Sequence, residues 1–211
     1  MEFDFLPEFN DQLQLFLTNS INSWHLEVKK LLPALPNRLD IVFDNQYLVP
    51  DKGIGGFALS REKVVLAFDT RFKGDKTDQI KWLRGSYFHE CYHIIQNFVG
   101  DQRSKDLEAI SYAVFEGLAT KFEVIRAGVT PEWATYPDNQ TMLQWTSKVK
   151  ALPKGYDWRV WQIKVPKTKE KWILFRVGTY IADQALRTSN ASIESLALKS
   201  PQDTLAIARL G

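Results

Sequence analysis

The amino-acid sequence predicts an α+β fold in which a small mixed or antiparallel sheet packs on a pair of helices, followed by a mostly helical C-terminal region. Two observations support this class. Long segments with apolar residues three or four positions apart lie on both sides of a short region rich in β-branched and aromatic residues. Glycine and proline separate these segments, and the chain has neither an internal repeat nor a low-complexity linker.

The length of 211 residues allows a sizeable core but disfavours two large domains, so we expect a single compact domain. Within it we expect an N-terminal helix and small sheet in residues 1–72, a helix pair in residues 73–128 and a helical subdomain in residues 129–211. The 27 basic and 25 acidic residues are scattered along the chain. No nucleic-acid or membrane partner is therefore indicated.

Features of export and membrane insertion are not evident in the sequence. The N-terminus has neither the basic flank nor the cleavage site of a signal peptide, and no stretch approaches the roughly 20 apolar residues that cross a bilayer. Cys91 is the single cysteine, which excludes an internal disulfide. We therefore expect a cytoplasmic protein.

The first predicted helix lies in residues 7–35 and contains His25. Its apolar stripe ends before Pro33 and Pro36. We expect His25 to be a core histidine, because it lies far upstream of the other two histidines. Short strands are predicted next, with turn residues between them. These strands are expected at residues 38–43, 56–59 and 64–68.

Two longer helices are predicted in the middle of the chain. One is capped by Thr77 or Asp78 and runs to residue 97 or 98, before Gly100. The other begins after Ser104, with two acidic residues, Asp106 and Glu108, in its first turn, and ends at Gly128. Further helices are expected at residues 139–152, at 172–186 and, as two short ones, after residues 190 and 201. An aromatic-rich loop is expected up to residue 171.

The first of these central helices carries the pattern His89-Glu90-Cys91-Tyr92-His93. Residues four apart lie on one face of a helix, so the two imidazoles can share a tetrahedral metal ion. Glu90 lies about 100° further round the helix, beside the metal, which suits a base acting on metal-bound water. Cys91 falls on the opposite side, and we expect it to be a packed core thiol.

A third ligand must come from elsewhere in the chain, and Glu116 is the strongest candidate. It lies within a long apolar run, where a carboxylate is costly to bury unless it is paired or binds a metal. Pairing with Arg84 or Arg176 is the other explanation for its burial. Glu108 and Glu123 lie at the edges of the run, and we expect both to be solvated.

These residues resemble the gluzincins, the thermolysin-like zinc peptidases. The shared features are His89-Glu90-x-x-His93 and, on the next helix, Glu116 followed by Gly-Leu-Ala. Within that group the chain is most similar to small, largely uncharacterised domains described as predicted zinc-dependent proteases. The similarity covers about residues 40–205 and includes residues 55–58, 64–68 and 175–181. Thr120 is a departure, because thermolysin has an aspartate at that position.

The resemblance implies a zinc-dependent peptidase acting on a peptide or protein substrate. Zn²⁺ would be held by the helix pair through His89, His93 and Glu116, and Glu90 would be the general base. Tyr180 and Arg176 are candidates for stabilising negative charge on the carbonyl oxygen, because the C-terminal helix corresponds to one that lines the cleft in similar enzymes. The strand at residues 56–59 could pair with an extended substrate, although a simple edge strand explains it equally well.

Two other functions fit the same residues. A non-catalytic metal-binding or interaction domain could use this scaffold, although an intact Glu90 argues against it. A zinc hydrolase acting on a non-peptide amide is the second. The seven tryptophans, including Trp158 and Trp161, fit either a substrate surface or ordinary core packing. Neither the cleavage preference nor the oligomeric state is indicated by the sequence.

Overall fold

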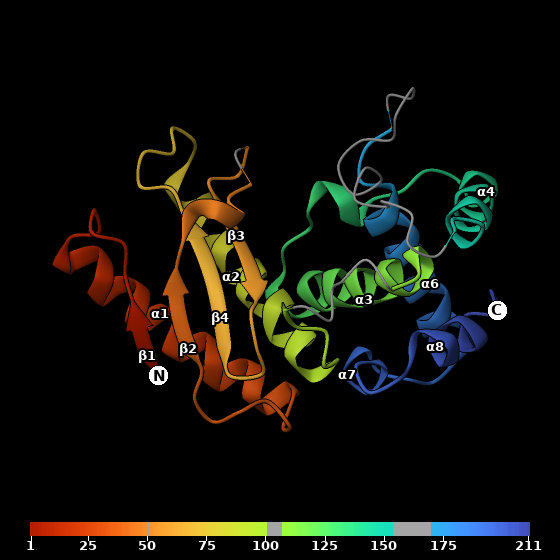
Figure 1. Cartoon of the computed structure of the whole chain (residues 1–211), viewed down its shortest axis with the longest axis horizontal. Coiled ribbons are helices and arrows are strands. Elements are labelled where there is room, and N and C mark those ends of the chain that lie inside the picture. Colours follow the sequence, from red (N-terminus) through yellow and green to blue (C-terminus); the bar gives the residue numbers. More distant parts are fainter. Residues whose placement is uncertain (50, 101–106, 154–169) are drawn as a thin grey trace. The chain divides into compact units, whose positions relative to one another are not determined.

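The computed structural model describes residues 1–49, 51–100, 107–153 and 170–211 (Figure 1). Over these residues it has seven α-helices and a four-stranded mixed sheet, which confirms the predicted α+β class. Contacts divide the chain into two compact units, Met1–Gly100 with Arg126–Val129, and Asp101–Ile125 with Thr130–Gly211. That the chain folds as a single domain, as its length suggested, stays a prediction.

The sheet belongs to the first unit and has the strand order β1-β2-β4-β3. Its strands are β1 (Glu2–Asp4), β2 (Asp40–Phe43), β3 (Ile54–Ala58) and β4 (Lys63–Phe68). The β1–β2 and β2–β4 pairs are parallel, whereas β3 pairs with β4 in the antiparallel sense. Strand β3 is therefore an edge strand, and a short 3-10 helix, η1 (Asn45–Tyr47), lies in the chain between β2 and β3.

Strand β1 was not predicted, because three residues are too few to show an alternating pattern. Aromatic packing accounts for its position. The ring of Phe5, just after the strand, stacks on Phe43 at 5.2 Å and on Phe3 at 5.6 Å. Phe9 then contacts Phe43 edge-on, also at 5.2 Å. The contacts with Phe43 are long-range in sequence, and a local pattern does not contain them.

Two long helices of the first unit match the predicted ones closely. Helix α1 (Asp11–Leu31) is capped by Asn10, whose side chain accepts from the Leu13 N–H at 2.9 Å. Helix α2 (Lys76–Ile95) is capped by Asp75, not by Thr77 or Asp78 as predicted. The reason is that Asp75 still has extended backbone and accepts from both of those amides, whereas they already belong to the helix.

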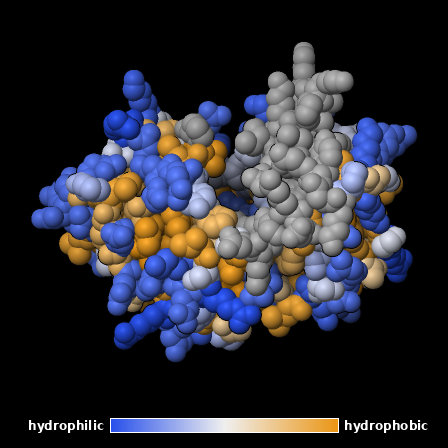
Figure 2. Space-filling model, viewed as in Figure 1, coloured by the Kyte–Doolittle hydropathy of each residue, from blue (hydrophilic) through white to orange (hydrophobic). Residues whose placement is uncertain are grey.

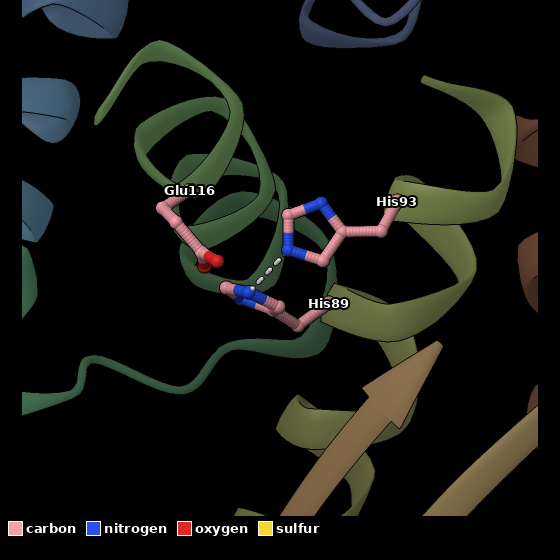
Figure 3. A group of neighbouring side chains, drawn as sticks. All are labelled: His89, His93 and Glu116. Carbon is pink, nitrogen blue, oxygen red and sulfur yellow. Dashed lines mark hydrogen bonds between the residues drawn. The ribbon is translucent and has the colours of Figure 1, made fainter. Parts of the chain in front are cut away.

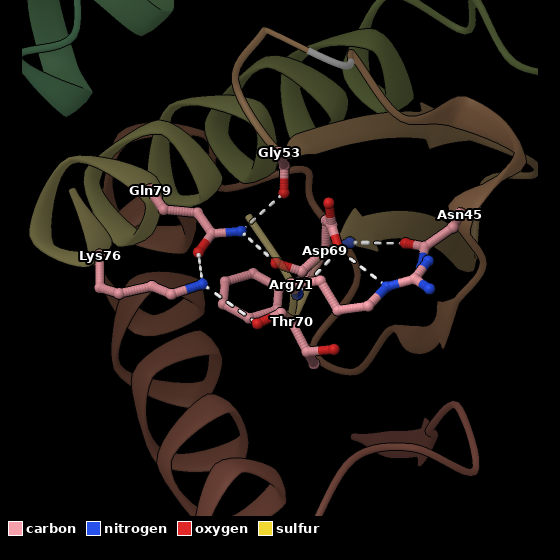
Figure 4. Close-up of polar contacts among 8 residues, drawn as sticks. Asn45, Gly53, Asp69, Thr70, Arg71, Lys76 and Gln79 are labelled. Atoms are coloured by element: carbon pink, nitrogen blue, oxygen red, sulfur yellow. Dashed lines mark hydrogen bonds and ion pairs between the residues drawn. The ribbon is translucent and has the colours of Figure 1, made fainter. Parts of the chain in front are cut away.

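A buried glutamine attaches the start of α2 to the ends of two strands (Figure 4). The Gln79 side-chain amide donates to the carbonyls of Gly53 and Asp69, both at 2.8 Å. Lys76 donates to the Gln79 side chain and to the Thr70 carbonyl, each at 3.2 Å. Because Gln79 is fully buried, its bonds to the two carbonyls fix where the helix begins relative to the sheet.

His25 joins the two long helices, and it is a buried core histidine as predicted. Its Nε2 lies 3.2 Å from the Asn37 carbonyl, so this nitrogen donates, and its Nδ1 accepts from the Tyr87 hydroxyl at 2.8 Å. Both contacts are satisfied by a neutral ring. Burial accordingly lowers the pKa of His25 below its ordinary value.

The second unit is helical in the part of the chain that is described. It contains α3 (Ala109–Phe122), α4 (Asn139–Lys150), α6 (Ile173–Thr188), α7 (Ile193–Leu196), α8 (Pro201–Ile207) and the 3-10 helix η4 (Glu132–Ala134). Helices α4, α6, α7 and α8 agree with the predicted positions to within a few residues, whereas η4 was not predicted. The predicted aromatic-rich loop, with Trp158 and Trp161, falls largely outside the described residues.

Helix α3 differs from its prediction at both ends. It begins at Ala109, and Glu108 is its N-cap residue, not a member of its first turn. Ser104 and Asp106 lie outside the described residues. At the other end the helix does not continue to Gly128 in α form, because residues Glu123–Ala127 form a short π-helix, η3. Such widened turns are rare, and no simple sequence signal marks them.

Helices α3 and α6 touch through their backbones. A methyl group added at Gly117 would lie 1.8 Å from the carbonyl carbon of Gly178, and one added at Gly178 would lie 1.8 Å from the Ala113 carbonyl oxygen. Real contacts of this kind do not occur, so both positions require glycine. The close approach fixes α3, including its ligand candidate Glu116, against α6.

The visible surface mixes apolar and charged residues, with apolar area gathered over part of the first unit (Figure 2). Large exposed apolar side chains are spread over several elements, which is ordinary for a folded protein. They are Leu15, Phe16, Leu26, Leu59, Ile125, Leu143 and Leu198. Over the described residues, no helix has the combined length and apolarity needed to cross a membrane.

Replacing His25 with alanine should lower the free energy of unfolding without affecting metal binding. The Tyr87 hydroxyl would lose its buried acceptor, which costs about 1–3 kcal/mol. Chemical denaturation and metal analysis of the folded variant measure the two effects. Loss of metal from this variant would instead identify His25 as a ligand.

The stability of the wild type should also depend more strongly on pH than that of His25→Asn. Burial holds the folded-state pKa of His25 below its ordinary value of 6.5, so the unfolded chain binds this proton first as the pH falls. The stabilising contribution of neutral His25 is present above about pH 6.5 and is lost as the pH falls from there through the folded-state pKa. Subtracting the unfolding free energies of the two proteins at each pH removes the contribution of other groups. A flat difference would contradict this assignment.

Gly178→Ala should destabilise the protein strongly, because the added methyl meets backbone atoms that cannot rotate away. Overpacking of this kind costs about 1–3 kcal/mol or more. Arg187→Ala, at an exposed position on the same helix, is the matched control and should change stability by less than about 0.5 kcal/mol. Equal thermal unfolding midpoints for the two variants would show that α3 and α6 are not in backbone contact.

Candidate metal centre

The second half of helix α2 carries three buried polar side chains in succession along the motif. His89 is 8% exposed, Glu90 is 5% exposed and His93 is fully buried. The Nε2 atoms of the two imidazoles lie 3.0 Å apart (Figure 3). Residues four apart on a helix were predicted to converge in this way, and this prediction is confirmed.

Gln96 orients one of the two imidazoles. The Nδ1 of His93 lies 2.8 Å from the side-chain oxygen of Gln96, one turn further along the helix. Because an amide oxygen only accepts, Nδ1 carries the proton, and Nε2 of the neutral ring presents its lone pair. A partner of this kind is typical of metal-binding histidines. Gln96 was not predicted as a site residue, although an amide three residues after a candidate ligand can indicate such a partner.

Glu116 completes a group of candidate metal ligands. One ligand atom from each of His89, His93 and Glu116 lies within 4.8 Å of the others, and all three residues are buried. The Glu116 carboxylate points towards the imidazole rings (Figure 3). These are the three residues that the gluzincin resemblance implied as ligands.

The donor set fits a zinc ion. In a tetrahedral zinc site with bonds of about 2.0–2.1 Å, two nitrogen ligands lie roughly 3.3 Å apart, close to the 3.0 Å between the Nε2 atoms of His89 and His93. Two imidazoles and one carboxylate form a known catalytic set that leaves the fourth position open for water or substrate. The same three residues would also bind other divalent metals, because the metal that such a site holds depends on geometry, ligand type and metal availability.

Glu90 is directed towards the sheet. Its Oε2 accepts from the backbone N–H of Ala58 on β3 at 2.7 Å. A methyl group at Gly56 would lie 2.8 Å from Cγ of Glu90, so the glycine leaves room for this carboxylate against the strand. Glu90 is not a member of the ligand group. Its role as a base beside the metal stays a prediction.

The arginines considered as partners of Glu116 have other surroundings. Arg84 pairs with Glu27 at 2.7 Å. The Nε atom of Arg176 is buried and has no hydrogen-bond partner in the described structure. Neither observation shows an ion pair between Glu116 and one of these arginines, which was the alternative explanation for the burial of Glu116.

Tyr180 belongs to a polar network within the second unit. Its hydroxyl donates to the side-chain oxygen of Asn139 at 2.6 Å, and burial raises its pKa. Its ring packs edge-on against Tyr136, whose hydroxyl donates to Asp183 at 2.7 Å. Asp183 in turn pairs with Lys121 at 2.5 Å. The hydroxyl proposed to stabilise a carbonyl oxygen is therefore already engaged.

The other residues near the motif for which burial or exposure was predicted are Glu108, Glu123 and Cys91. Glu108 is exposed as expected, but Glu123 is only 4% exposed, so the expectation that it is solvated was wrong. It begins the π-helix, where the chain stays packed beyond the end of the apolar run. Cys91 is a fully buried thiol, as predicted, and burial raises its pKa well above the ordinary value.

Thr120 occupies the position of the thermolysin aspartate, one turn after Glu116. Its side chain is fully buried, and its hydroxyl has no hydrogen-bond partner in the described part of the chain. A threonine is too short to act as the missing carboxylate. Any outer-shell support for the ligands must therefore come from elsewhere, and Gln96 supplies it for His93.

Comparisons of the chain with protein-family models, with curated proteins and with solved structures find no significant match. The gluzincin resemblance thus rests on the motif residues alone. The geometry adds two observations that do not depend on any relative. His89, His93 and Glu116 form a buried group, and Glu90, next to His89 in the chain, is bonded to Ala58 of β3.

Glu116→Gln should lower zinc affinity steeply, because the neutral amide is a far weaker ligand than the carboxylate. The loss should exceed the roughly 10–100-fold typical of outer-shell changes. Glu123→Gln is the matched control, since it neutralises a second buried carboxylate on the segment that follows α3, and it should leave affinity within a few-fold. Competition titration against a chromogenic chelator measures both constants. The reverse pattern would place the third ligand at Glu123.

Proposed function

We propose that the chain is a zinc-dependent peptidase in which His89, His93 and Glu116 hold the metal and Glu90 is the general base. The observation that carries this proposal is the buried His-His-Glu group. Glu90 follows His89 directly in the chain, is not a member of the group, and is held by the Ala58 N–H. A structural zinc site is a poorer explanation, because such sites normally use four protein ligands, mostly cysteines, and the chain's one cysteine is packed in the core.

When bound, zinc would supply a water of lowered pKa and would polarise the substrate carbonyl. The protein's own contribution is to move the proton. Glu90 would accept it from the attacking water and pass it to the leaving amine. The hydrogen bond from the Ala58 N–H fixes one carboxylate oxygen and so orients the side chain for this transfer.

Strand β3 suits an extended peptide substrate. It lies at the edge of the sheet, and its Ala58 N–H points away from β4, since that hydrogen is donated to Glu90. Backbone groups alternate in direction along a strand, so those of Gly56 point the same way. A peptide added beside β3 would therefore use the Gly56 groups and pass next to Glu90.

Two residues of α6 are candidates for stabilising negative charge on the carbonyl oxygen. Tyr180 would have to exchange its part-buried bond to Asn139 for one to the substrate oxygen. Arg176 has an unpartnered Nε–H. The proposed reaction requires neither residue for metal binding.

Glu90→Gln should retain stoichiometric zinc while peptide hydrolysis falls by at least the roughly 10²–10⁴-fold of general-base loss. The variant is isosteric, and its amide oxygen still accepts from Ala58, so the fold and the strand contact are preserved. A peptide-library cleavage assay, with and without a chelator and with zinc added back, measures the activity. An unchanged rate in the variant would exclude this mechanism. A wild type that binds zinc but cleaves no peptide would favour a metal-binding interaction domain.

A further inference from the structure

Three aromatic rings meet at the start of helix α6. Trp133, on η4, lies 4.9 Å from Trp172 and 5.9 Å from Phe175, and the last two rings are also 5.9 Å apart. All three side chains are half-buried. Arg176 follows directly, one turn after Trp172, whose carbonyl accepts the Arg176 backbone N–H. We call these four residues the aromatic-arginine group.

The backbone of this group is strained at Trp172. This residue caps the N-terminus of α6 with φ of 61° and ψ of 29°, and its side chain makes no capping hydrogen bond. A bulky residue rarely adopts the left-handed region, which is usually left to glycine or asparagine. Backbone strain of this kind tends to occur at ligand-binding sites, where the surrounding contacts maintain it.

Two buried donors in the group have no partner. The indole Nε1 of Trp133 and the Nε of Arg176 are both buried without a hydrogen bond in the described structure. Indole and guanidinium groups donate and never accept, so what is missing is an acceptor. Because one donor carries a positive charge, the acceptor that satisfies it best is an anion. Buried donors are nearly always paired, and two in one group indicate a bound partner.

The group lies near the candidate ligand Glu116 within the second unit. Arg176 precedes Gly178 by two residues, and Gly178 touches Gly117, which follows Glu116 directly. Arg176 thus lies within one turn of the point where α6 meets the ligand-bearing helix. A peptide bound near Glu116 could reach the aromatic-arginine group with a nearby residue.

We propose that the aromatic-arginine group is a subsite that binds a carboxylate of a peptide together with an apolar side chain beside it. One guanidinium matches the single charge of a carboxylate, and the three rings provide flat apolar area for the neighbouring side chain. This inference rests on the proposed function, because the ligand is the substrate or product of the proposed peptidase. Arg176 then contributes to substrate binding and not to the charge on the carbonyl oxygen.

The test uses the zinc-loaded Glu90→Gln protein, which binds peptides without cleaving them. N-acetyl-Ala-Ala-Phe with a free C-terminal carboxylate, its C-terminal amide, and N-acetyl-Ala-Glu-Phe amide are titrated by calorimetry. At least one carboxylate peptide should bind about tenfold or more tightly than the uncharged amide. The two carboxylate peptides distinguish a chain terminus from an acidic side chain.

Variants then assign the difference to this group. Arg176→Gln should remove the preference for the carboxylate while leaving affinity for the uncharged amide within a few-fold, and Trp133→Phe should reduce the preference while keeping a ring in place. Arg187→Gln, exposed on the same helix, is the control and should retain the preference. A preference that survives Arg176→Gln would be due to zinc and would overturn the proposal, as would equal binding of all three peptides.

Kinetics on otherwise wild-type protein separate this inference from the proposed function. Arg176→Gln should raise KM for the carboxylate peptide with kcat unchanged. A fall in kcat for acid and amide peptides alike would show that Arg176 acts on the carbonyl oxygen, and would overturn the subsite. If the wild type cleaves nothing but binds the carboxylate through Arg176, the subsite stands and the peptidase proposal fails.

Discussion

The placement of helix α2 along the sheet is the constraint on which the candidate site depends. Near its start, the buried Gln79 amide is bonded to the ends of β3 and β4, and near its end the Glu90 carboxylate is bonded to Ala58 of β3. The helix is therefore held at two points more than two turns apart. Because His89 and His93 project from the same rigid element, their separation is set before any metal binds.

A succession of buried polar groups surrounds this helix, and each carries a desolvation cost that its partners must offset. His25 is satisfied by Tyr87 and Asn37, and His93 by Gln96. The ligand group concentrates two imidazoles and a carboxylate in one buried place. Such a concentration is common in catalytic sites and uncommon in cores held together by packing alone.

Local patterns were enough to predict the helices and strands that carry the site. The spacing of His89 and His93 implied a shared face, and the apolar setting of Glu116 implied burial. Features that depend on distant residues were not predictable in this way. Strand β1, for example, depends on aromatic contacts with Phe43. The N-cap of α2 is a local feature, but which residue fills it depends on the extended backbone of Asp75, and the sequence pattern does not specify that conformation. The burial of Glu123 follows from a π-helix, for which the sequence has no simple signal.

The glycine beside Glu90 and the glycine pair between α3 and α6 differ in the sequence changes that they permit. Gly56 has no side chain because Glu90 occupies that space, so loss of the glutamate side chain would open position 56 to larger residues. Positions 56 and 90 are therefore expected to change together if either changes. Gly117 and Gly178 allow no such exchange, since both are already the smallest residue and meet backbone to backbone. Purifying selection at these two positions would consequently persist in any descendant that keeps the fold, whether or not it keeps Glu90.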